Sequence, residues 1–173
     1  MKTVKYPLVT ASVFLWIGFV GAISFMEAWL KFQAPGITVT LGLGIGRLVF
    51  FALNKVEWVL ALAIAISYLA NKEPLLNNPN GYYWISVVLL TLQTVWLLPV
   101  LDHRAELLIQ GIEIPSAPYH LIYVGTEIVK ISSLIIFGIK QFRAHLKNAY
   151  HENQRESNHW RTGSTTLQSS SRI

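Results

Sequence analysis

Four long apolar stretches, separated by short segments rich in proline, glycine or polar residues, constrain this chain more than any other feature. They run from about 7 to 30, 43 to 70, 82 to 101 and 119 to 142. Ala34-Pro35-Gly36 is predicted to break the first from the second, and Asn77-Asn78-Pro79-Asn80-Gly81 predicts a turn before the third. A helix needs about 20 apolar residues to cross a hydrocarbon core of roughly 30 Å, and each stretch meets that length. The sequence therefore predicts an all-α integral membrane four-helix bundle in residues 1–147, followed by a disordered polar cytoplasmic tail in residues 148–173.

The composition agrees with a chain whose solvent is lipid. Apolar residues make up 53% of the 173 residues and charged residues 13%, whereas soluble domains are about 25% charged. The net charge of +5 gathers at the two ends and beside the apolar stretches, so we expect no nucleic-acid partner. The absence of cysteine excludes disulfides, thiolate metal sites and a cysteine nucleophile. The stretch that begins at Pro7 is too long for the apolar region of a signal peptide, so we interpret it as a retained first helix.

The distribution of lysine and arginine predicts the orientation of the bundle. With the N-terminus inside, nine of the 14 basic residues face the cytoplasm: Lys2, Lys5, Lys72, Lys140, Arg143, Lys147, Arg155, Arg161 and Arg172. The other five lie in the spans or the outer loops: Lys31, Arg47, Lys55, Arg104 and Lys130. We therefore expect both termini on the cytoplasmic side of the plasma membrane, which in a bacterium is the inner membrane.

Polar side chains inside the predicted spans are the strongest functional signal, because ionisable groups are costly in lipid unless they are paired or hydrated. In three spans they recur at spacings of three, four or seven, which places each set on one helix face. The candidate ligand- or proton-binding residues are Glu27, Arg47, Asn54, Glu57, Gln93, Asp102, Arg104, His120, Glu127 and Lys130. We expect these side chains to converge inside the bundle, between its midplane and its outer surface.

A helical rise of about 1.5 Å per residue gives the depth of each charged group and so its partner. The predicted pairs are Glu57 with Lys130, Glu127 with Arg47 or Lys55, and Glu27 with Arg47 or Arg104. In the third span an unbroken helix would place Arg104 on the same face as Gln93, eleven positions earlier. Asp102 would point elsewhere unless Pro99 bends the helix.

Two further local patterns predict how the helices meet and end. Glycines 42, 44 and 46 open the second span, and small residues there allow close approach of helices or an irregular helix start. Residues 105–109 are expected to continue the third helix above the membrane as a lid. Gln110-Gly111 is expected to end it, since glycine commonly follows the last helical residue.

Three function classes remain open. The leading prediction is an outward-facing polar cavity that binds or moves a small charged solute or protons. The second is a non-catalytic subunit of a larger membrane complex, in which the polar residues hold helices in register. The third and least favoured is a small membrane enzyme that acts on a lipid or quinone. The predicted spans contain no His-x-x-x-His and no Glu-x-x-His of the kind that di-iron bundles use, and no convincing catalytic triad is present, so we expect neither metal nor other cofactor. Transport by so small a bundle would require a homodimer or larger complex.

The first two spans also resemble a known family. Gly21-Ala22 is followed by Phe25-Met26-Glu27-Ala28-Trp29-Leu30-Lys31-Phe32, a glycine-rich return and an amphipathic second helix. This arrangement, over about a third of the chain, resembles the four-helix family of transmembrane protein 205 and its bacterial relatives. The basic proline-containing motif of that family is absent from the return, and Gly46-Arg47 is the nearest substitute. The resemblance implies a four-helix membrane architecture and no particular functional residue.

Overall fold

The computed structural model describes residues 7–71 and 81–143. Most of the turn predicted at 77–81 and the whole tail predicted at 148–173 lie outside these ranges. The regular secondary structure of the described residues is helical, with no strand among them, and it includes four helices long and apolar enough to cross a membrane. These are Pro7–Gln33, Val39–Ala70, Gly81–Ile109 and Tyr119–Arg143. The predicted all-α class and the four spans are confirmed, and four such helices indicate an integral membrane protein.

Two of the four spans contain a short segment of wider, π-helical turns. The first span consists of α1 (Pro7–Val20), the π-helical η1 (Gly21–Glu27), α2 (Ala28–Leu30) and the 3₁₀ turn η2 (Lys31–Gln33). The third consists of α4 (Gly81–Leu92), the π-helical η4 (Gln93–Leu97) and α5 (Leu98–Ile109). The second span is the single helix α3 (Val39–Ala70), and the fourth is helix 119–143.

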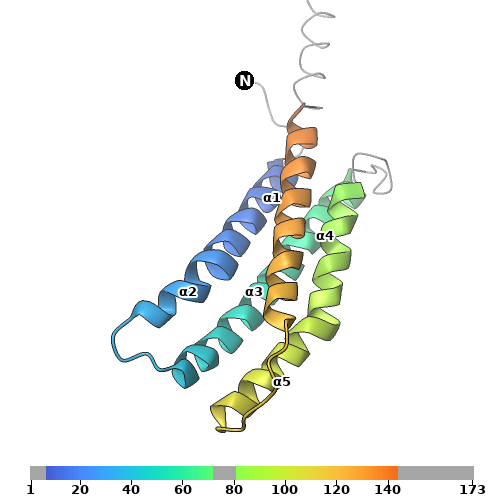
Figure 1. Cartoon of the computed structure of the whole chain (residues 1–173). Coiled ribbons are helices and arrows are strands. Elements are labelled where there is room, and N and C mark those ends of the chain that lie inside the picture. The colour runs from blue at the N-terminus through green and yellow to red at the C-terminus, as the bar shows by residue number, and fades with distance from the viewer. Residues whose placement is uncertain (1–6, 72–80, 144–173) are drawn as a thin grey trace, which may run out of the picture.

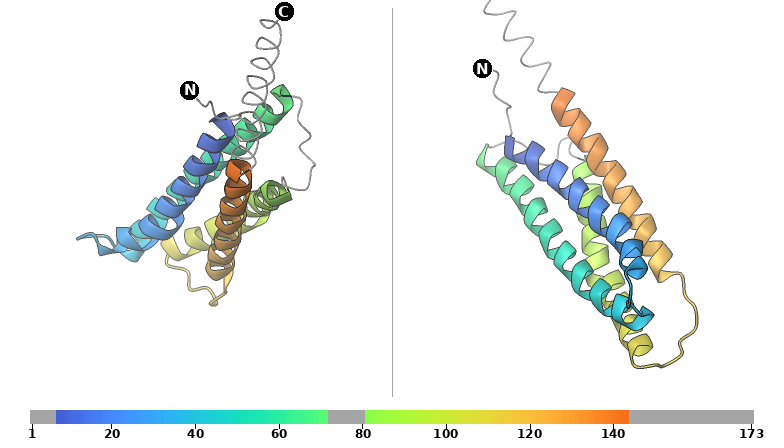
Figure 2. Two further views of the ribbon diagram at one scale, coloured as in Figure 1. Left: turned by 90° about the horizontal axis from the view of Figure 1, so that it is seen from above. Right: turned by 90° about the vertical axis from the view of Figure 1, so that its left-hand side faces the viewer.

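The four spans lie side by side and alternate in direction along the chain (Figures 1 and 2). Pro7, Ala70, Gly81 and Arg143 lie at one end of the bundle, which we call the Pro7 end. The connecting segments 34–38 and 110–118 lie at the opposite end, which we call the connector end.

Local chemistry explains why the first two spans are separated where they are. Ala34 has extended backbone, with φ −70° and ψ 135°, because the proline that follows it disfavours helical geometry. Gly36 turns the chain with a φ of 82°, a conformation that glycine adopts without strain. Thr38 then caps α3, since its hydroxyl accepts a hydrogen bond from the Leu41 amide at 3.2 Å. The predicted break at Ala34-Pro35-Gly36 is therefore confirmed.

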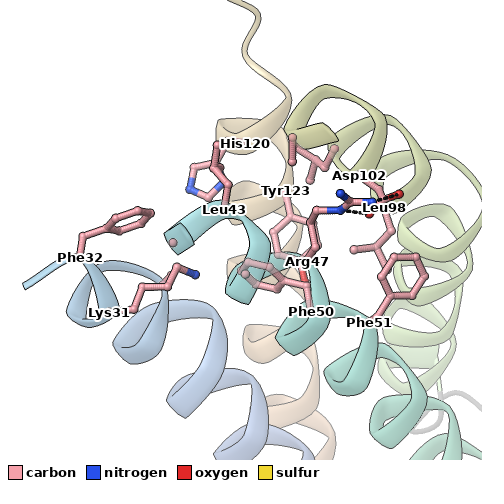
Figure 3. Close-up of a pocket in the computed structure, with 15 residues that line it drawn as sticks. Lys31, Phe32, Leu43, Arg47, Phe50, Phe51, Leu98, Asp102, His120 and Tyr123 are labelled. Atoms are coloured by element: carbon pink, nitrogen blue, oxygen red, sulfur yellow. Dashed lines mark hydrogen bonds and ion pairs between the residues drawn. The ribbon is translucent and has the colours of Figure 1, made fainter. Parts of the chain in front are cut away.

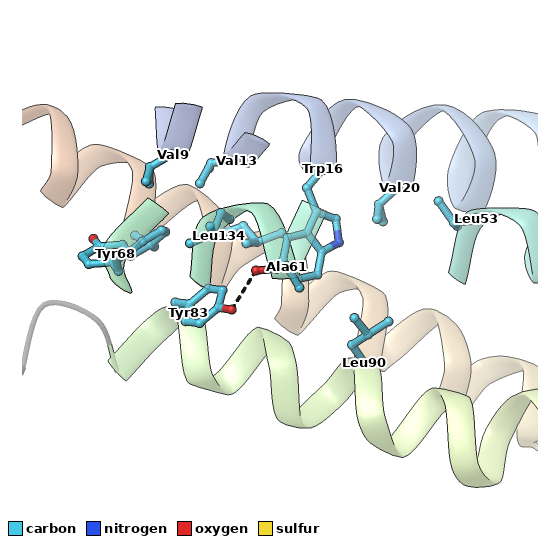
Figure 4. Packing of buried hydrophobic residues seen from close by; sticks show 12 residues of the cluster. Val9, Val13, Trp16, Val20, Leu53, Ala61, Tyr68, Tyr83, Leu90 and Leu134 are labelled. Atoms are coloured by element: carbon cyan, nitrogen blue, oxygen red, sulfur yellow. Dashed lines mark hydrogen bonds between the residues drawn. The ribbon is translucent and has the colours of Figure 1, made fainter. Parts of the chain in front are cut away.

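An apolar core fills the half of the bundle nearest the Pro7 end (Figure 4). All four spans contribute to it: Val9, Val13, Trp16, Val20, Leu53, Ala61, Ile64, Tyr68, Tyr83, Leu90, Leu134 and Phe137. The Tyr83 ring lies 5.8 Å from that of Phe137, and its hydroxyl donates to the Ala61 carbonyl at 3.0 Å. Because every span supplies side chains to this core, the core fixes the rotation of each helix about its axis.

Large apolar side chains are exposed on the outside of all four spans. The exposed fractions are 66% for Phe14, 75% for Leu48, 74% for Val95 and 72% for Leu121. Exposed apolar surface on this scale is unfavourable in water and is the surface that hydrocarbon chains solvate. Packing and exposure thus agree with the membrane assignment that follows from helix length.

Candidate functional site in the bundle interior

A lysine in the middle of the fourth span is surrounded by acceptors from three helices. Lys130 Nζ lies 2.5 Å from Glu57 Oε1 and 2.6 Å from Gln93 Oε1. It lies 3.1 Å from Glu127 Oε2 and 3.2 Å from Glu127 Oε1. We call Glu57, Gln93, Glu127 and Lys130 the buried cluster. The predicted pairing of Glu57 with Lys130 is confirmed, as expected for antiparallel helices that place both residues at the same depth.

The buried cluster is packed in protein on all sides. Lys130 and Glu127 are 0% exposed, and Glu57 and Gln93 are 1% exposed. The Trp16 indole donates to Glu57 Oε1 at 2.7 Å, so the first span closes the cluster from its side. These four side chains, which the sequence suggested would line a polar cavity, instead form a hydrogen-bonded network in direct contact.

Asn54 also faces inward but serves a separate contact. Its amide donates to Thr94 Oγ1 at 2.9 Å, and the Trp58 indole donates to the same oxygen at 3.0 Å. Together these bonds join α3 to η4 on the side of α3 next to the buried cluster. Asn54 is therefore a helix-to-helix contact and lies outside both the buried cluster and the pocket described below.

Arg47 holds α3 and α5 together near the connector end. Its Nε lies 2.6 Å from Asp102 Oδ1 and its Nη2 3.2 Å from Asp102 Oδ2, and its Nη1 donates to Glu106. The prediction that Arg47 pairs with Glu27 or Glu127 is wrong. The two acidic residues of α5 reach Arg47 because they lie four positions apart on one helix face.

Glu27 and Glu127 each find a lysine on their own helix. Glu27 pairs with Lys31, four residues on, at 3.3 Å, instead of with Arg47 or Arg104. Glu127 pairs with Lys130, three residues on, instead of with Arg47 or Lys55. Residues three or four apart lie on the same helix face. Both glutamates therefore pair within their own helix, and the cross-helix pairs predicted from depth alone do not form.

Arg104 lies on a different face of the third span from Gln93. Its guanidinium donates to the Pro115 carbonyl at 2.6 Å and lies 5.5 Å from the Tyr119 ring centroid. Ala105 takes the buried position instead. Arg104 therefore fastens the connection between the third and fourth spans, and the prediction that it shares the face of Gln93 is wrong.

The π-helical segment η4 explains this rotation. A π-helical segment accommodates one extra residue, and each residue of a helix corresponds to about 100° of rotation. The signal in the sequence is Pro99, which has no amide hydrogen and whose ring crowds the carbonyl four residues earlier, at Val95 in η4. The altered register turns Asp102 toward Arg47. The sequence predicted that Asp102 would point elsewhere unless the helix was perturbed near Pro99, and the helix is perturbed there.

A pocket of about 290 Å³ lies beside the buried cluster, toward the connector end (Figure 3). Most of its lining is apolar. It is lined by Ala28, Lys31, Phe32, Gly42, Leu43, Gly46, Arg47, Phe50, Phe51, Leu98, Leu101, Asp102, Ala105, His120 and Tyr123. The first, second, third and fourth spans all contribute, so the pocket depends on the complete bundle.

Two glycines of α3 make room for the pocket wall. A Cβ on Gly46 would lie 2.9 Å from Lys31 Nζ, and a Cβ on Gly42 would overlap the Phe32 ring. A Cβ on Gly44 would meet no atom within 4 Å. The predicted close approach is therefore confirmed at Gly42 and Gly46, and Gly44 faces open space.

The charged groups of the pocket differ in how fully they are paired. The Arg47 guanidinium is bound by two carboxylates. The Lys31 ammonium has one carboxylate partner and lies 5.5 Å from the ring centroids of Phe32 and Phe50. The His120 ring is exposed and has no hydrogen-bond or ion-pair partner within the described residues. Lys31 and His120 both project toward the pocket in Figure 3, and they retain free hydrogen-bonding capacity.

Several residues of the site were absent from the predicted candidates, among them Trp16, Lys31, Phe50, Glu106 and Tyr123. Trp16 was missed because its indole looks like one more apolar side chain, although its spacing from Val13 and Val20 places it on the buried face. Glu106 was missed although it follows Asp102 by one helical turn. Phe50 was missed because an apolar pocket wall has the same sequence signature as a packed core.

Within residues 7–71 and 81–143, no three histidine, aspartate or glutamate side chains gather in a way that could hold a metal ion. No protein-family model, no curated protein and no solved structure matches this chain. The resemblance to the transmembrane protein 205 family therefore stays a prediction, and the functional argument rests on the pocket and the buried cluster.

Proposed function

We propose that this membrane protein binds a small anionic amphiphile in the pocket near the connector end. The observation that carries the proposal is the combination of apolar walls with two nitrogen-bearing side chains, Lys31 and His120, that keep hydrogen-bonding capacity. The volume of about 290 Å³ is at the lower limit of small-molecule pockets, which begin at roughly 300 Å³.

The apolar part of the ligand would lie against Phe50, Leu98 and Leu101, which form the side of the pocket nearest the bundle interior. Burial of apolar surface supplies most of the affinity of such a site, at about 25 cal/mol per Å². A ligand without an apolar part would leave these walls unfilled, so a simple inorganic ion is disfavoured.

The charged part of the ligand would lie near Lys31 and His120. Arg47 is already bound by Asp102 and Glu106, so it holds the shape of the pocket and contributes little free positive charge. The Lys31 ammonium has three hydrogen-bond donors and a single carboxylate partner at 3.3 Å. This supports an anionic group over a cationic one, although the predicted solute could carry either sign.

We further propose that the connector end faces the outside of the cell, as the lysine and arginine distribution predicts. The pocket would then be reached from the outer leaflet or the outer aqueous phase. Binding is the part of the predicted function that the pocket supports, and movement of the ligand or of protons across the membrane stays a prediction.

A matched pair of fluorescent probes tests the proposal. 1-Anilinonaphthalene-8-sulfonate is an anionic amphiphile, and N-phenyl-1-naphthylamine is its uncharged analogue. The purified protein in detergent should bind both probes. Lys31→Met should lower the affinity for the anionic probe about tenfold, equivalent to about 1.4 kcal/mol, and should change the affinity for the neutral probe little.

A pocket-filling variant provides the control for non-specific binding to the apolar surface. Ala28→Phe places a ring in the pocket and should abolish binding of both probes. Ala11→Phe makes the same change at an exposed position of α1 and should leave binding unchanged. Equal binding by the two alanine variants would refute the pocket as the ligand site and would favour the alternative of an accessory subunit.

A further inference from the structure

The buried cluster contains unequal numbers of acidic and basic groups. Glu57 and Glu127 supply two carboxyls, and Lys130 supplies one amine. If all three were ionised, the cluster would carry a net charge of −1 among side chains that are at most 1% exposed. An unbalanced charge in such an environment is strongly disfavoured.

Lys130 must itself be a charged ammonium. Its Nζ has four oxygen neighbours from Glu57, Gln93 and Glu127, all within 3.2 Å. A charged ammonium offers three N–H donors and no acceptor, which suits an environment made only of acceptors. A neutral amine would offer two donors and point a lone pair at an oxygen. The excess negative charge therefore has to be neutralised by a proton on one of the two carboxyls.

No other charged group is placed to supply that balance among the described residues. The first span faces the cluster with Trp16 and Ser24, and the third with Gln93, all uncharged. The fourth span adds the neutral hydroxyls of Tyr123 and Thr126. On α3 the next basic residue on the inner side is Arg47, already held by two carboxylates. Lys55 is exposed on the other side of α3 from Glu57.

We propose that the buried cluster is a proton-binding site that holds one exchangeable proton, carried by Glu127. This site is separate from the pocket, and the proposal of a proton here does not depend on the ligand proposed for the pocket. A single proton brings the cluster to zero net charge without any group that the structure lacks.

Two unsatisfied oxygens locate the proton. Glu127 Oε2 and Ser24 Oγ are buried and receive no directed hydrogen bond from the described residues. Oε2 lies 3.1 Å from the Lys130 ammonium, but the three N–H donors of that ammonium face four oxygens, so one oxygen is left without a donor. The Tyr123 side chain lies against both of them. With a proton on Oε2, Glu127 would donate to the Tyr123 hydroxyl, which would donate in turn to Ser24. Glu57 is a poorer position for the proton, because its Oε1 accepts from Lys130 at 2.5 Å and from Trp16 at 2.7 Å.

Tyr123 also connects the buried cluster with the pocket. It is buried in the bundle yet lines the pocket, so its hydroxyl lies between the pocket and the Glu127 carboxyl. The pocket is therefore the side from which the cluster exchanges its proton.

Infrared spectroscopy counts the proton directly, because a protonated carboxyl has a C=O stretch that a carboxylate lacks. The protein would be measured at pH 8 in dodecyl maltoside, which has no carbonyl group of its own. We expect a band equivalent to one carboxyl per chain. Glu127→Gln and Glu57→Gln should each remove the band, since each leaves one carboxylate opposite one ammonium. Lys130→Met should double it.

Two variants refine and control this count. Tyr123→Phe should keep one carboxyl but shift its C=O stretch to higher frequency, because the protonated Glu127 loses its hydrogen-bond acceptor. Glu27→Gln, which alters a carboxyl near the connector end, should leave the band unchanged.

Three results would overturn the proposal. One is the absence of a protonated-carboxyl band in the unmodified protein at pH 8, a measurement that needs no variant to fold. Another is a band that survives in Glu57→Gln. The third is a band that is present in choline chloride and absent in sodium chloride, which would show that a sodium ion balances the cluster instead.

Discussion

At the scale of single residues, Lys130 is the charge on which the bundle interior depends most. Replacing it with methionine leaves two carboxyls facing each other in a water-free site. We expect Lys130→Met to lower the free energy of unfolding by roughly 3–5 kcal/mol, the usual cost of removing one partner from a buried ion pair. Thermal unfolding in detergent, followed by tryptophan fluorescence, measures the loss.

Lys140→Met is the matched control, because Lys140 lies on the same helix and is exposed. Its ammonium lies 4.2 Å from the Tyr82 ring centroid, a contact worth about 0.5–1 kcal/mol at an exposed site. If the two lysine variants lost equal stability, the buried cluster would have no special structural role.

The glycines that open α3 make a second prediction at this scale. Gly44→Ala adds a methyl group in open space and removes a flexible residue from a helix, so it should stabilise the bundle by about 0.5–1 kcal/mol. Gly46→Ala should change stability less, because its methyl group would displace only the flexible end of Lys31. That displacement should weaken binding of the anionic probe. Equal probe affinity in the two variants would mean that the position of Lys31 does not matter for binding.

At the scale of helices, hydropathy predicted the four spans and the break between the first two, because lipid solvation requires long apolar runs. The rotation of a helix about its axis is harder to predict, since one extra residue in a π-helical segment leaves hydropathy unchanged. This is why Gln93 was placed correctly inside the bundle while Arg104 was not. The ion pairs followed the same pattern: Glu57–Lys130 was found, and the partners of Arg47 were missed because they lie beyond η4.

The π-helical segment η4 can be tested by deletion. Removing Val95, an exposed residue of η4, takes away the extra residue and should allow an ordinary helix that still brings Asp102 to Arg47. Removing Val88, an exposed residue of α4, should instead rotate everything after it by about 100°. The two valines are 74% and 63% exposed, so lost packing is similar in both. We expect the Val95 deletion to fold with the higher unfolding temperature, and the reverse order would contradict the assigned register.

At the scale of the whole molecule, the two ends of the bundle differ in construction. The half near the Pro7 end is filled by the apolar core, whereas the half near the connector end contains the pocket and most charged side chains of the spans. The buried cluster lies between them. The sequence predicted this polarity from the depth of the charged residues, but it could not distinguish a polar cavity from a packed network beside an apolar pocket. That difference depends on how side chains fill space, which residue spacing does not encode.

The orientation of this asymmetric bundle is the remaining prediction, and the lack of native cysteine makes it simple to test. Single cysteines at Gln33 and Ile112 mark the connector end, where both residues are exposed, and a cysteine at Ser164 marks the tail. A membrane-impermeant maleimide added to intact cells should label the first two positions and should label the third only after permeabilisation. The expectation follows from the basic residues that flank the spans, since nine of the 14 lie on the side that would stay inside. The opposite labelling pattern would place the pocket on the cytoplasmic side, and its ligand would then have to be sought among cytoplasmic anionic amphiphiles.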